Sequence, residues 1–107
     1  MDMDIFSVLA VPTRRNILEV IVKNGQLPAS DIYSHFSVSP QAISQHLKIL
    51  REANLVTVEK QGQKRLYTLN QKELLILGDW VQMMAEKWNE RFSALDTLLA
   101  KEKNKLN

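Results

Sequence analysis

The sequence predicts a mainly helical fold with one small β-hairpin, within the α+β class. Apolar residues recur at spacings of three and four over most of the chain, as they do in amphipathic helices. Residues 55–69 differ, because two short β-branched or aromatic runs flank a polar turn centred on Gly62. The chain has 107 residues, of which 45% are hydrophobic, enough for one modest core. We therefore expect residues 1–107 to form one domain of about five helices and a two-stranded hairpin.

Three short helices are expected in the first third of the chain, over residues 4–10, 12–23 and 28–36. Asn24 and Gly25 end the second helix, because both residues tolerate the left-handed conformation. Residues 26–27 are expected to connect it to the third helix, either as a simple connector or as one strand-like pair of residues. The first helix is too short to be stable alone, so its apolar side chains must pack on another surface. These side chains are Ile5, Phe6, Val8 and Leu9.

The fourth helix, over residues 39–52, has the clearest start. Ser39 can cap it, and Pro40 suits the first helical position because its missing N–H costs nothing there. Its apolar stripe consists of Ile43, Leu47 and Leu50. The opposite face carries Gln41, Gln45, Lys48 and Glu52, with Ser44 at its edge. Amides and cations of this kind can read base edges and contact phosphates, although an ordinary solvated face would look similar.

A short helix, a three-residue turn and a second capped helix form a helix-turn-helix, and the hairpin that follows has the position of a wing. The hairpin turn is expected over residues 60–64. Residues 40–65 hold five basic residues and two acidic ones, whereas residues 71–107 hold six of each. The basic excess therefore lies on the fourth helix and the hairpin, which favours a nucleic-acid partner over a hairpin whose lysines only aid solubility.

The last helix is expected over residues 71–101, with Asn70 and Glu73 arranged as a capping box. At about 1.5 Å per residue it would be about 45 Å long. Its apolar residues exceed what one small domain can cover, which predicts a partner chain, most simply a twofold copy. Two tryptophans and two methionines on this helix also leave open a pocket for a ligand.

Three segments carry a resemblance to a known family: residues 12–18 (PTRRNIL), 39–56 (SPQAISQHLKILREANLV) and 62–69 (GQKRLYTL). They resemble the ArsR family of bacterial winged-helix repressors, and the long last helix is similar to that of its branch without a metal site, the SdpR-type autorepressors. The sequence departs from the family pattern in two places, since the turn of the helix-turn-helix lacks glycine and Asn54 stands where glycine is usual. The resemblance implies a homodimer, built from the first and last helices, that represses transcription from an operator.

The resemblance places one group of residues in the major groove: Ser39, Pro40, Gln41, Ser44, Gln45 and Lys48. Gln41 and Gln45 are the best candidates to read bases, because a glutamine amide can pair bidentately with adenine. His46 lies on the flank of the helix, where packing between helices or a phosphate contact is favoured over base reading. The wing is expected to hold the DNA backbone or reach a minor groove, and its candidate DNA-binding residues are Lys60, Gln63, Lys64 and Arg65.

The resemblance likewise places the dimer interface on the apolar side chains of the first and last helices. These are Ile5, Phe6, Leu9, Leu77, Trp80, Val81, Met84, Trp88 and Leu95.

Several classes of function are disfavoured by what the sequence lacks. It has no cysteine, its last helix has no histidine, and its two histidines lie on different helices, so we expect no metal site and no cofactor. No glycine-rich phosphate loop, cysteine nucleophile or clustered acid–base set indicates an enzyme. There is no long apolar run, and the acidic start lacks the pattern of a signal peptide, so we expect a cytoplasmic protein without a membrane partner.

Two alternatives to a simple repressor stay open. A winged helix can serve as a protein-interaction module without touching DNA, in which case the apolar last helix would dock a partner. Alternatively, the last helix of a repressor could sense a small apolar ligand or an antirepressor protein. The sequence does not specify an effector, an operator or a regulated gene.

Overall fold

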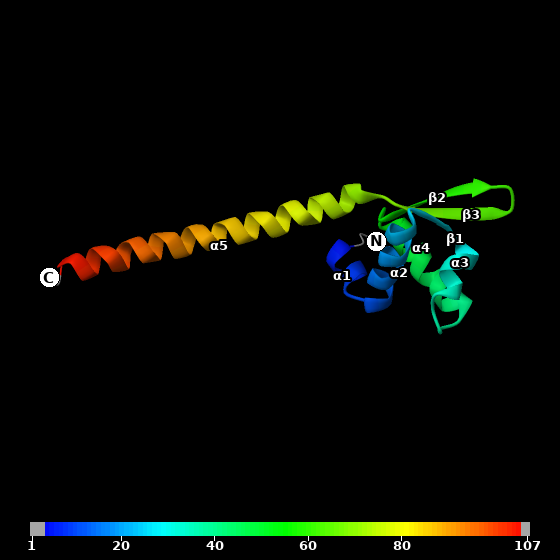
Figure 1. Cartoon of the computed structure of the whole chain (residues 1–107), viewed down its shortest axis with the longest axis horizontal. Coiled ribbons are helices and arrows are strands. Elements are labelled where there is room, and N and C mark those ends of the chain that lie inside the picture. Colours follow the sequence, from blue (N-terminus) through cyan, green and yellow to red (C-terminus); the bar gives the residue numbers. More distant parts are fainter. Residues whose placement is uncertain (1–3, 106–107) are drawn as a thin grey trace. The chain divides into compact units, whose positions relative to one another are not determined.

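The computed structural model describes residues 4–105, with side chains for residues 4–102. It divides into two compact units after Leu74, and each is described by itself. The first unit holds four helices and three strands, and α5 begins at its end (Figure 1). In chain order these elements are α1 (Ile5–Leu9), α2 (Pro12–Asn24), β1 (Gln26–Pro28), α3 (Ala29–Ser34), α4 (Pro40–Glu52), β2 (Val56–Gln61) and β3 (Lys64–Leu69).

Most helix ends lie within a residue or two of their predicted positions, although α3 ends at Ser34, two residues before its predicted end. The Asp4 carboxylate caps α1 by accepting from the Phe6 N–H at 3.2 Å. Gly25 ends α2 with φ at 77°. Ser39 Oγ caps α4 by accepting from the Ala42 N–H at 3.2 Å, and Asn54 follows this helix with φ at 61°. Both positions after a helix need the left-handed region, which glycine and asparagine tolerate best.

The sheet has three antiparallel strands in the order β1-β3-β2, so the prediction of a two-stranded hairpin is incomplete. Residues 26–27, expected as a connector or one strand-like pair of residues, form β1 together with Pro28 and pair along β3, with Leu27 opposite Tyr67. The expected five-residue turn is also wrong, because β2 and β3 continue to Gln61 and Lys64. Only Gly62 and Gln63 lie between the strands, and Gly62 has φ at 61°, as the first position of a type II′ turn requires.

The core lies where α2, α3 and α4 meet the sheet. Its fully buried side chains are Ile17, Ile21, Ile32, Ile43, Leu47, Leu50, Leu55 and Val56. All three residues of the stripe predicted for α4 belong to this set. The opposite face of α4 is consequently held outward by close packing, since turning the helix would expose three buried side chains.

Helix α5 runs from Gln71 to Lys105, four residues beyond its predicted end. Asn70 Oδ1 accepts from the Lys72 N–H at 3.3 Å, as a cap should. The predicted capping box also requires the Asn70 N–H to donate to the Glu73 carboxylate. Instead, the Asn70 N–H donates to the carbonyl of buried Leu55 at 2.9 Å.

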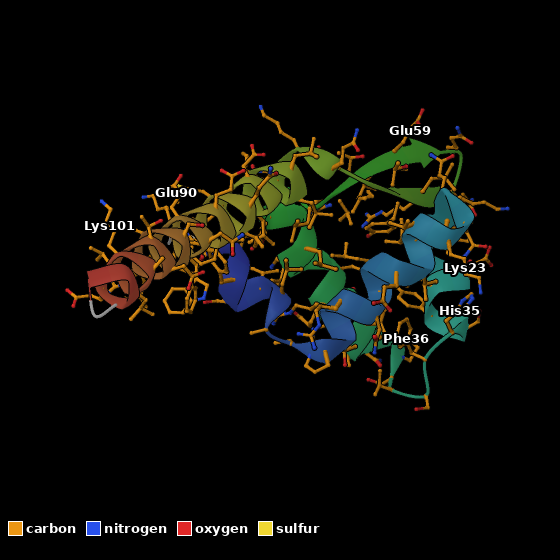
Figure 2. All side chains as sticks on the ribbon, turned by 60° about the vertical axis from the view of Figure 1, so that its left-hand side comes forward. Lys23, His35, Phe36, Glu59, Glu90 and Lys101 are labelled. Carbon is orange, nitrogen blue, oxygen red and sulfur yellow. The ribbon has the colours of Figure 1, made fainter. Side chains whose placement is uncertain are left out.

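The second unit consists of the rest of α5, residues 75–105. Glu90 and Lys101 lie along one side of it (Figure 2). Its exposed large apolar side chains are Leu75, Ile76, Trp80, Val81, Met83, Met84, Trp88, Phe92, Leu95, Leu98 and Leu99.

Candidate nucleic-acid interface

The outward face of α4 carries the polar residues that the sequence places there. The expected major-groove residues are all exposed: Ser39, Pro40, Gln41, Ser44, Gln45 and Lys48. They lie on one side of a 13-residue helix whose other side is anchored in the core. The helix therefore presents two amides, hydroxyls and one ammonium in a fixed arrangement, which suits hydrogen bonding to base edges.

His46 lies on the flank of α4 that faces α2. Its Nδ1 accepts a hydrogen bond from Arg14 Nε at 3.2 Å, and Arg14 also donates to the Val8 carbonyl at 3.5 Å. Burial lowers the pKa of His46, and the nearby guanidinium of Arg14 lowers it further. The neutral imidazole thus joins α4 to α2 and, through Arg14, to α1. A phosphate contact by the other ring nitrogen stays a prediction.

The pleat of the hairpin separates the wing residues into two groups. Lys60 and Arg65 are cross-strand partners, and they share a face with Val58 and Tyr67, which packs on the helices. Lys64 lies on the other face together with Glu59, which points away from the helices in Figure 2. Gln63 lies in the turn at the tip. The structure therefore places Lys60 and Arg65 on the hairpin face that packs on the helices and separates Lys64 from them.

Two further residues, Tyr33 and Arg51, lie near the hairpin face that carries Arg65 and Tyr67, although the sequence did not single them out as site residues. Burial raises the pKa of Tyr67, as does the neighbouring phenol of Tyr33, while the charges of Arg51 and Arg65 act in the opposite direction. These effects place Tyr33, Arg51 and Arg65 around one phenol. Arg51 comes seven residues after Ser44, hence on the same edge of α4, and that spacing could have identified it.

The expected dimer residues are divided between the two units. In α1, Phe6 is exposed and Ile5 and Leu9 are half-buried. In α5, Leu77 is half-buried, and the remaining five (Trp80, Val81, Met84, Trp88 and Leu95) are between 46% and 59% exposed. Aqueous exposure of so many large apolar side chains on one helix is unfavourable, which is characteristic of a protein-binding surface.

Across residues 4–105, no three histidine or carboxylate side chains gather in a way that could hold a metal ion. Within the same range, no helix has the length and apolar character needed to cross a membrane.

The first unit combines a small helical core with a three-stranded sheet, an outward polar helix and a hairpin that carries paired cations. This combination defines the winged helix-turn-helix class of DNA-binding proteins. The model of bacterial regulatory proteins of the arsR family matches residues 11–58. The chain is 37% identical over 78 residues to the transcriptional repressor SdpR of Bacillus subtilis (strain 168), covering 73% of this chain and 86% of that one. The chain therefore belongs to the ArsR family, and the resemblance found in its motifs is confirmed.

Other relatives agree. The arsenical resistance operon repressor of Staphylococcus aureus is 37% identical over 78 residues, which cover 73% of this chain and 71% of that protein. Among solved structures, an ArsR-like transcriptional regulator from Rhodococcus sp. RHA1 matches with a TM-score of 0.76 and 28% identity, covering 88% of each chain. The fold, like the sequence, is that of a transcription regulator.

Proposed function

We propose that this protein is a sequence-specific repressor that binds an imperfect palindromic operator as a homodimer. The observation that carries the proposal is the outward face of α4, where Gln41, Gln45 and Lys48 are exposed while the opposite stripe is fully buried. The similarity to proteins named as repressors supports the same function.

Each part of the interface has a distinct role in this proposal. Gln41 and Gln45 read adenines through bidentate hydrogen bonds in the major groove. Lys48 contacts phosphate. Lys60 and Arg65 hold the DNA backbone beside the wing, which fixes the register of the protein without reading sequence.

A dimer supplies the symmetry that an operator needs. In this proposal α1 and α5 form the interface, which would cover the exposed apolar side chains of α5. A twofold dimer presents two recognition helices to successive major grooves, about 34 Å apart on one side of the duplex. Repression follows because the bound dimer occupies DNA that RNA polymerase requires. The protein acts by binding alone, with no catalytic step or cofactor, in the cytoplasm where it meets the DNA.

The test begins with the DNA upstream of the protein's own gene. Fluorescence anisotropy at about 0.15 M salt would compare a labelled upstream duplex with a scrambled duplex of equal length. We expect the upstream duplex to bind at least about 10³-fold more tightly, the usual minimum for a specific site. If the upstream duplex shows no preference, selection from a random duplex pool would search for another operator. Failure to enrich any sequence would contradict specific DNA binding and favour a protein-interaction module.

A further inference from the structure

An open hollow lies between α3 and the outward face of α4. It is lined by Tyr33 of α3 and by Pro40, Gln41, Ser44 and Gln45 of α4. Four of these five residues belong to the face proposed to enter the major groove. The fifth, Tyr33, has no role in the proposed function.

Tyr33 and Pro40 give this hollow a chemistry that the rest of the face lacks. Apart from Pro40, the outward side chains of α4 end in amides, hydroxyls, an ammonium, a guanidinium and a carboxylate. Tyr33 of α3 and Pro40 instead present the apolar surfaces of an aromatic ring and a pyrrolidine ring. Tyr33 is half-buried and packs against the core next to fully buried Ile32, so its ring is held in place. Pro40 is exposed, and its ring is fixed at the first position of the helix.

The base edges of B-DNA present one apolar group in the major groove, the C5-methyl group of thymine. We propose that the hollow receives this methyl group, and that Tyr33 is therefore a specificity-determining residue. The inference rests on the proposed function and specifies the base composition that the site would read. Gln41 and Gln45, on the rim of the same hollow, suit adenine, and the thymine of an A·T pair projects its methyl group into the same groove.

Replacing single thymines by deoxyuridine tests this directly, because only the methyl group is removed. Each thymine of the operator would be replaced in turn and the affinity measured by anisotropy. We expect that replacing one particular thymine in either half-site lowers the affinity of the protein for the operator about fourfold. This factor follows from the free energy of burying one methyl group.

The same scan with protein variants assigns the effect to the hollow. We call the ratio of the affinities for the thymine and the deoxyuridine operators the deoxyuridine penalty. In Tyr33→Ala and in Pro40→Ala, this penalty at that position should fall from about fourfold toward one. In Tyr33→Phe, which keeps the ring, the penalty should persist. Lys48→Ala, outside the hollow, should weaken binding to all duplexes and leave the penalty unchanged. Because Tyr33 also packs on the core, Pro40→Ala provides the test if Tyr33→Ala does not fold.

Two results would overturn the inference while leaving the repressor proposal intact. One is specific operator binding in which no thymine shows a deoxyuridine penalty. The other is a penalty that stays at its full size in Pro40→Ala and in any folded Tyr33→Ala protein. A chain that prefers no duplex at all would instead overturn the repressor proposal, and this inference with it.

Discussion

Neighbouring residues on α4 have opposite surroundings. Gln45 is exposed, whereas His46 is held at the α2 flank by a hydrogen bond from Arg14. Consecutive residues on a helix lie about 100° apart, so one step moves a side chain from the groove side to the packed side. The run Ser44-Gln45-His46 therefore contains two exposed side chains and one packed side chain rather than one reactive cluster.

Gln45→Ala should discriminate base reading from general attraction to DNA. Loss of a bidentate contact with adenine should cost about 1–3 kcal/mol in each half-site of the operator and little on random DNA. Anisotropy on both duplexes measures this, with Lys48→Ala as the control that should weaken both. Equal losses on the two duplexes for Gln45→Ala would rule out its base-reading role.

Arg14 and His46 should make the protein less stable in mild acid. In the unfolded chain His46 titrates near about pH 6.5, and in the folded protein its pKa is lower because of burial and then Arg14. The unfolded state therefore binds the proton more readily, so the stability from this group is complete above about pH 6.5 and declines as the pH falls below it. Thermal unfolding between pH 7.5 and 5.5 measures the effect.

His46→Asn supplies the matched variant for this prediction. An asparagine Oδ1 occupies the place of Nδ1 and can accept from Arg14, yet it does not titrate. We expect it to remove part of the loss of stability in acid, whereas His35→Asn, at the other histidine, should leave the effect of His46 in place. An identical pH dependence in wild type and His46→Asn would show that this hydrogen bond is not the acid-sensitive element.

At the scale of elements, the pairing register of β2 and β3 decides which charged side chains lie on each face of the hairpin. Lys60 and Arg65 are directly opposite each other, although like charges at such a position repel and destabilise a hairpin. An anion between the two cations would relieve that repulsion. The arrangement is therefore better suited to a bound phosphate than to the stability of the free protein.

Three substitutions that each remove one positive charge test the register of the wing. Lys60→Ala and Arg65→Ala should each reduce the slope of log affinity against log salt by about 1.8, because a homodimer loses one phosphate contact in each half-site and each contact contributes about 0.9. Lys64→Ala should change the slope less, because Lys64 lies on the face that carries Glu59. Neither Lys60→Ala nor Arg65→Ala should lower the melting temperature through lost charge pairing. A Lys64→Ala effect equal to the other two would contradict this division.

The elements with local signals were predictable from the sequence, and those that depend on pairing were not. The start of α4 is encoded by Ser39 and Pro40 within the helix itself, so it could be predicted. For strand β1 the sequence suggested at most one strand-like pair of residues, because the strand has three residues and its partner β3 lies about 40 residues later, a pairing that has no local pattern. The division of the wing cations between two faces follows from a two-residue turn, which leaves Lys60 and Lys64 within the strands. The predicted five-residue turn placed both lysines in the loop, so it could not assign them to a face.

The candidate site shows the same limit. The amides of α4 follow from helical spacing, and the structure finds them exposed as expected. Tyr33 could not be assigned from spacing, because an aromatic residue beside buried Ile32 has the pattern of core. Only the packing of α3 against α4 shows that its ring reaches the hollow beside Gln41.

At the scale of the whole molecule, the second unit poses a problem of solvation. From residue 75 onward, most large apolar side chains of α5 are exposed, two tryptophans among them. Trp88 and Phe92 pack edge to face at 4.7 Å between ring centroids, which shields little of either ring. Burial of this surface in a homodimer would provide the hydrophobic driving force for association, and it would also join two recognition helices in one molecule.

Trp88→Glu should therefore separate the protomers. A buried carboxylate without a partner is strongly unfavourable, so we expect monomers in sedimentation equilibrium at concentrations where wild type is dimeric. Thr97→Glu is the matched control, because Thr97 lies about 180° around the helix from Trp88 and its hydroxyl bonds to the Ser93 carbonyl in its own helix. The monomer should lose at least about 10²-fold in operator affinity, since one half-site no longer recruits the other. A Trp88→Glu protein that stays dimeric and binds the operator as wild type does would exclude this face of α5 from the interface.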